Sequence, residues 1–238
     1  MKGELRALGL AHGLLLGLLL ALPLVASPRL LPWAAEALFI MGGFQLRLAD
    51  RRWDMRGGPL GWISHIRMAP GRLLPWGAAA VVALIARRTQ DAQAIIGAAL
   101  LCELLLYPMC AHLIGRLARP LAAALLLLLI AGQAAAGSEM MRYMLAFITG
   151  MTACLVWLRG PDGDARATGL AFAGLSAAVA APMAAPQLLP FAVPAGSVCA
   201  VLALANLSVL RRRPVPWCSN GGQDRLKRGL WPIPSWLS

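Results

Sequence analysis

Charge is what this sequence has least of. Only 13% of its 238 residues are Asp, Glu, Lys or Arg, whereas about 25% is usual in soluble globular domains. The deficit is concentrated in long apolar runs, and residues 167–210 carry no charge at all. A soluble core has no use for an uncharged run of that length, so the composition excludes an ordinary soluble fold.

Motifs for metal, nucleotide and thiol chemistry are also missing. The three histidines are scattered, and the five cysteines form no CxxC or CxxxC pair, which is the spacing expected of most zinc and redox sites. The sequence contains no glycine-rich phosphate loop of the usual kind. We therefore expect no cofactor and no metal, with the cysteines serving as small apolar side chains.

Long apolar segments are what the sequence does contain. A membrane-spanning helix needs about 20 such residues, and this pattern predicts an all-α, polytopic transmembrane bundle with about eight spans. The expected spans are 7–26, 30–47, 73–88, 92–115, 118–136, 140–158, 168–186 and 188–210. Residues 1–210 form a single domain in this prediction. The basic tail 211–238, rich in Trp and Pro, is expected to be disordered or interfacial.

Positive charge sets the orientation of these spans, because short cytoplasmic loops collect Lys and Arg. With eight spans and both termini cytoplasmic, 18 of the 22 Lys and Arg fall on the inner side and four on the outer side. The segment 73–88 is the weakest span, since it has only fourteen uncharged residues. If it did not cross, the split would become 11 to 11. We therefore expect it to cross, and we expect 7–26 to be retained rather than cleaved as a signal peptide.

The pentapeptide RLLPW occurs at 29–33 and again at 72–76. Proline suits a first helical turn and tryptophan suits the headgroup level. The flanking residues of the two copies do not align as a repeat. Each copy is therefore interpreted as a membrane-entry signature, with its arginine in water.

The cytoplasmic loop 48–72 and the tail together carry +8 of the chain's net charge of +12. The loop is expected to be amphipathic and interfacial. Basic segments of this kind suit anionic lipid headgroups, so lipid is the expected partner and nucleic acid is not. The residues expected to contact headgroups are Arg51, Arg52, Arg56, Arg211, Arg212 and Arg213.

Glu103 is the main candidate for function, because a carboxylate inside a span is costly and is usually retained for a purpose. Tyr107 and Cys110 follow at i+4 and i+7 on the same helical face. Pro108 lacks an N–H and should free a carbonyl one turn back. The sequence predicts a polar, kinked stripe, serving either as a proton, cation or substrate site or as a protonated glutamate bonded to a neighbouring helix.

Three further features are candidates. Glu36 is expected close enough to the outer interface to reach water, with a possible role in transport. Gly9, Gly13 and Gly17 have the spacing of a close helix–helix seam, which could also bind membrane-protein partners. The repeat of Pro182, Pro186, Pro190 and Pro194 predicts either a broken helix lining a cavity or an outer turn between two helix ends, and the turn is slightly favoured.

Three functional classes fit these observations. A small transporter or channel for a solute, an ion or a lipid would use Glu103 and the proline kinks. A non-catalytic membrane subunit or assembly factor would need only small-residue seams and possible membrane-protein partners. A membrane enzyme acting on a lipid- or acyl-linked substrate would use the inner arginines, but catalytic motifs are absent. We expect a transport-like protein of a bacterial-type inner membrane.

Overall fold

The fold is seen in a computed structural model, which describes residues 13–14, 17–21, 23–49, 65–67, 69–160 and 165–210. All regular elements within these ranges are helices, as the apolar runs predict. The first predicted span, 7–26, is described only in part. The tail 211–238 and most of the loop 48–72, including Arg51, Arg52, Arg56 and Arg211–213, lie outside the described residues.

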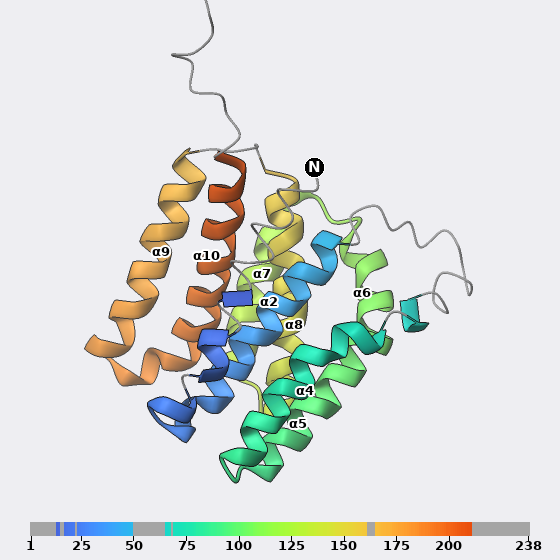
Figure 1. The fold of residues 1–238 in the computed structure, drawn as a ribbon. Coiled ribbons are helices and arrows are strands. Elements are labelled where there is room, and N and C mark those ends of the chain that lie inside the picture. The colour runs from blue at the N-terminus through green and yellow to red at the C-terminus, as the bar shows by residue number, and fades with distance from the viewer. Residues whose placement is uncertain are drawn as a thin grey trace, which may run out of the picture.

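The described helices form one bundle (Figure 1). The α-helices are α2 (Leu31–Ala49), α4 (Ala69–Ile85), α5 (Thr89–Leu101), α6 (Tyr107–Ile114), α7 (Arg119–Ala134), α8 (Glu139–Leu158), α9 (Ala165–Ala184) and α10 (Leu189–Leu210). The 3-10 helices η1 (Pro28–Leu30) and η4 (Pro186–Leu188) precede α2 and α10. The π-helical turn η3 (Cys102–Leu106) joins α5 to α6.

Four stretches of helix in the described residues are long and apolar enough to cross a membrane. They are Thr89–Ile114, Glu139–Leu158, Ala165–Ala184 and Pro186–Ser208. Two more apolar helices, Ala69–Ile85 and Arg119–Ala134, are shorter. The chain is thus a helical membrane protein. The predicted span boundaries agree with the helix boundaries to within a few residues, but the count of eight spans is not confirmed.

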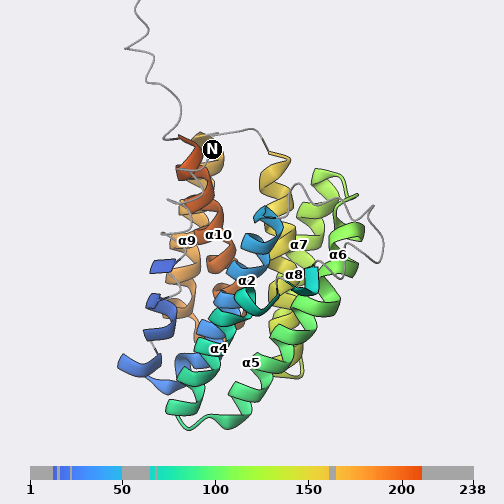
Figure 2. The same cartoon turned by 45° about the vertical axis from the view of Figure 1, so that its right-hand side comes forward.

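Helices α2 and α8 form the centre of the bundle, and they share its most extensive helix–helix contact. The α4–α5 hairpin and α7 pack around α8, while α10 covers α2 and carries α9 on its outer side (Figures 1 and 2). Phe39, Phe44 and Phe147 are fully buried between these elements. Only Thr168 and Ala171 of α9 are buried, so α9 is the most peripheral of the long helices.

The second RLLPW copy does not mark a headgroup level, and this prediction was wrong. Helix α4 begins at Ala69, so Arg72 lies in its first turn, where its partly exposed side chain contacts a buried carboxylate. Trp76 is only 5% exposed and stacks on Phe39, with ring centroids 4.2 Å apart. At the first copy, Arg29 is exposed, as expected.

Candidate functional site

Glu103 lies near the middle of the apolar stretch Thr89–Ile114. Its side chain is only 4% exposed, and Oε2 lies 2.9 Å from Nε of Arg72. A carboxylate at this depth is unfavourable without such a partner. Because Arg72 belongs to the first turn of α4, the short helix α4 begins at the depth of Glu103 rather than at one surface of the bundle.

His65 completes the surroundings of Glu103. Its Nε2 lies 2.8 Å from the backbone carbonyl oxygen of Glu103, and its ring stacks on Tyr107 with centroids 5.1 Å apart. A guanidinium N–H of Arg72 donates to the His65 carbonyl at 2.9 Å. These four residues, Glu103, Arg72, His65 and Tyr107, are called the Glu103 cluster below.

The backbone of η3 explains why a carbonyl is available to His65. The N–H of Tyr107 donates to the carbonyl of Cys102, five residues earlier, as in a π-helix. In that register the next donor, residue 108, would bond the carbonyl of Glu103, but Pro108 has no N–H. The freed carbonyl one turn back, which the sequence predicts, thus receives a side chain from a distant part of the chain.

A second group of charges lies at the ends of α2 and α8 that face the α4–α5 turn (Figure 1). Arg142 of α8 is placed between two carboxylates, with Nε 3.3 Å from Oε2 of Glu36 and a terminal nitrogen 2.7 Å from Oε2 of Glu139. Its guanidinium also lies over the ring of Trp33, 4.5 Å from the centroid. Glu36, Glu139, Arg142 and Trp33 are called the Glu36 cluster.

Glu36 is completely buried, so the expectation that it reaches water was wrong. The reason is that α8 lies against this part of α2 and supplies Arg142 as a partner for the carboxylate. Glu36 Oε1 and the hydroxyl of Tyr143 are buried with no hydrogen-bond partner among the described residues. These two oxygens are therefore acceptors or donors that a proton or a small polar solute could use.

Stacked aromatic rings run between the two clusters. Trp76 of α4 stacks on Phe39 of α2, and Phe39 stacks on Tyr143 of α8 at 5.1 Å. Trp76 is four residues after Arg72, and Phe39 is three residues after Glu36. The rings fix the helices that carry the charged groups and exclude lipid from the space between them.

The remaining predicted site residues lie in different parts of the bundle. Tyr107 joins the cluster, while Cys110 is half-buried at the next turn. The proline repeat is divided between the end of α9, the turn η4 and the start of α10, and Pro182 lines a pocket between α2, α9 and α10. A Cβ at Gly13 or Gly17 would meet no described atom within 4 Å. The glycine seam, which includes the undescribed Gly9, therefore stays a prediction.

Sequence reasoning missed two members of the Glu103 cluster. Arg72 and His65 lie 31 and 38 residues before Glu103 in the chain, and both were assigned to the loop 48–72. Only their amino-acid types indicated that they could be partners of Glu103, because an intramembrane carboxylate requires a cationic or donor partner. Nothing local indicates which of the chain's cations that partner is.

Arginines also gather at the opposite end of the bundle. A guanidinium N–H of Arg159 donates to the carbonyl of Gly115 at 2.7 Å. The side chain of Arg47, near the end of α2, lies close to the same glycine, and Arg119 is the first residue of α7 at this end.

In comparisons with known proteins, the chain matches no family model, no curated protein and no solved structure.

Proposed function

We propose that the chain is a small transport protein of a bacterial-type inner membrane, in which Glu103 is the coupling carboxylate. The observation that supports this proposal most directly is the Arg72–Glu103 pair, at a π-helical turn near the middle of an apolar helix. Short helices that begin at membrane depth and bring polar groups to mid-bilayer sites are a recurring feature of transporters. A π-turn is likewise frequent at functional sites.

The chemistry of the Glu103 cluster allows the carboxylate to exchange Arg72 for another partner. The carboxylate is stable at this depth only when paired or protonated. A proton, or the cationic group of a solute, can therefore replace Arg72, after which the guanidinium keeps its contact with His65 and turns its other N–H groups to water. In this proposal the Glu36 cluster provides a second exchange site, because Arg142 is already shared between two carboxylates.

Proteoliposomes test the proposal. Purified protein is reconstituted in phosphatidylethanolamine and phosphatidylglycerol vesicles that enclose a pH-sensitive dye, and a panel of amino acids, sugars, organic acids and inorganic ions is added outside. We expect at least one solute to move protons, and Glu103→Gln to slow that flux by about a hundredfold, as for loss of a proton-transferring group. Gln187→Ala, at an exposed position in η4, should leave the flux unchanged.

A non-catalytic membrane subunit is the second candidate, favoured by the exposed apolar surface of α9. Leu170, Val179 and Met183 are 62–84% exposed on this helix. Mass spectrometry of the protein after gentle detergent extraction separates the two functions. Stoichiometric partner proteins, together with a silent flux assay, would overturn the transport proposal and leave the Glu103 cluster with a role in packing.

A further inference from the structure

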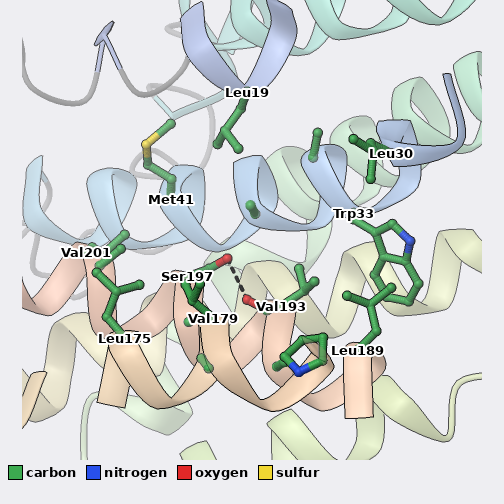
Figure 3. Close-up of a pocket in the computed structure, with 17 residues that line it drawn as sticks. Leu19, Leu30, Trp33, Met41, Leu175, Val179, Leu189, Val193, Ser197 and Val201 are labelled. Carbon is green, nitrogen blue, oxygen red and sulfur yellow. Dashed lines mark hydrogen bonds between the residues drawn. The ribbon is translucent and has the colours of Figure 1, made fainter. Parts of the chain in front are cut away.

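A long apolar groove lies between α2 and the α9–α10 pair, and Leu19 of the first predicted span also lines it (Figure 3). Its volume is about 390 Å³, which is within the usual range for sites that hold a small molecule. The groove does not include any residue of the Glu103 cluster. It meets the Glu36 cluster at one end only, through Trp33.

The lining offers an occupant almost no polar contact. Most lining side chains are aliphatic, and several are small, including Ala34, Ala37 and Ala200. Ser197 has the one hydroxyl in the lining, and it donates to the carbonyl of Val193 in its own helix at 2.7 Å (Figure 3). The chemistry therefore selects an aliphatic occupant.

The shape of the groove restricts that occupant further. Along α2 it extends from Trp33 to Met41, and along α10 from Leu189 to Val201, which correspond to about 12 and 18 Å of helix. One leaflet of the hydrocarbon core is about 15 Å deep. The groove is therefore about as long as one leaflet is deep, and it runs along the helices away from Trp33.

Helices α9 and α10 are packed closely against each other along the groove. A Cβ at Gly174 of α9 would lie 2.7 Å from Sγ of Cys199 in α10, so these two helices cannot approach each other further. Gly196 of α10 also lines the groove, and a Cβ there would lie 3.1 Å from Cβ of Ala178 in α9. Helices α9 and α10 therefore form one closely packed wall of the groove.

We propose that this groove holds one acyl chain of a zwitterionic phospholipid, with the headgroup at the Trp33 end. Tryptophan is favoured at headgroup level. The nearby charge of Arg142 is offset by Glu36 and Glu139, so the site gives no preference for an anionic headgroup. This inference does not rest on the transport proposal.

Photocrosslinking from the acyl chain tests this directly. The protein is reconstituted in phosphatidylethanolamine vesicles containing a phosphatidylethanolamine with a diazirine in mid-chain, irradiated, and mapped by peptide mass spectrometry. Met41 and Val201 line the groove and are otherwise buried, at 3% and 2% exposed, so only a chain inside the groove can contact them. We expect adducts on these two residues, as well as on the lipid-facing Leu127 of α7, which is 69% exposed.

Filling the groove provides the matched comparison. In the double variant Ser197→Leu/Ala200→Leu, the adducts at Met41 and Val201 should be lost while those at Leu127 remain. Ala124→Leu, the same kind of change at an exposed position of α7, should keep both sets. Adducts confined to the outer surface of the wild-type protein, or groove adducts that persist in the filled variant, would overturn the proposal. The wild-type map decides the matter even if the double variant does not fold.

Discussion

At the scale of single residues, the Arg72–Glu103 pair combines a large desolvation cost with a strong electrostatic attraction between the two charges. The Glu103 side chain is 4% exposed and that of Arg72 is 26% exposed, so both groups have lost most of their water. Removing one partner of such a pair leaves an uncompensated charge, whereas replacing both by apolar side chains is often neutral. The pair is thus expected to contribute more to function and specificity than to stability.

We expect Arg72→Met to lower the free energy of unfolding by about 3 kcal/mol, since Glu103 loses its partner. The double variant Arg72→Met/Glu103→Leu should recover most of that loss. Unfolding of the purified variants in mixed detergent micelles, followed by circular dichroism, measures both. Arg116→Met, at an exposed position, should stay within about 0.5 kcal/mol of the wild type. Additive losses in the double variant would contradict the pairing.

The His65–Glu103 contact leads to a second prediction at this scale. His65→Phe keeps an aromatic ring to stack on Tyr107 but removes the donor to the Glu103 carbonyl, together with the ring nitrogens that lie 3.1 and 3.3 Å from Arg72. An unsatisfied buried carbonyl costs about 1–3 kcal/mol, and the same unfolding measurement should show a loss of that size. Adding Pro108→Ala supplies an N–H close to this carbonyl, so the double variant should be more stable than His65→Phe alone. Equal stability of the two would show that the carbonyl has another donor.

At the scale of elements, the central α2–α8 contact depends on two glycines. A Cβ at Gly43 would overlap the carbonyl oxygen of Phe147, and a Cβ at Gly150 would overlap that of Ile40. The two backbones therefore touch, which in membrane bundles is possible only at small residues. This close approach buries Glu36 and brings Phe39 against Tyr143.

Gly43→Ala and Gly150→Ala should each lower stability by about 1–3 kcal/mol or more, because neither backbone can move away without disturbing the core. Gly169→Ala is the matched control, since its Cβ would enter open space in α9. That variant should be neutral or gain about 0.5–1 kcal/mol from helix propensity. Thermal unfolding of the three variants in one detergent provides the comparison, and a tolerated Gly150→Ala would contradict the contact.

At the scale of the whole molecule, the two ends of the bundle differ in charge. One end carries Arg47, Arg116, Arg119 and Arg159, and no carboxylate is paired with them among the described residues. At the other end, Arg88 and Arg142 are paired with Asp91, Glu36 and Glu139, while Arg29 and Arg87 have no ion pair among the described residues, so the positive charge there is largely offset. Unpaired arginine in short loops is typical of the cytoplasmic side.

We therefore expect the Arg119 end to face the cytoplasm. In a cysteine-free background, a membrane-impermeant maleimide added to intact spheroplasts should label Gln187→Cys but not Ala118→Cys, and both should react after lysis. These positions are exposed and lie at opposite ends of the bundle. The reverse labelling pattern would show the opposite orientation.

The sequence alone was sufficient to determine the class of protein, the approximate ends of most helices and two members of the Glu103 cluster, Glu103 and Tyr107. Those properties depend on local signals. A run of apolar residues requires a helix in lipid, Pro108 interrupts a hydrogen-bond ladder wherever it lies, and Glu103 is conspicuous because its neighbours are apolar.

Only the tertiary structure decided which residues meet. It placed Arg72 and His65 on Glu103, buried Glu36 beside Arg142, and brought Gly43 against α8. In a soluble bundle the apolar face of each helix indicates where it packs. In a membrane the lipid-facing surface is as apolar as the core, so the sequence of a helix rich in Ala and Leu does not show which of its faces packs against the bundle. Their facing partners follow from the packing of the whole bundle.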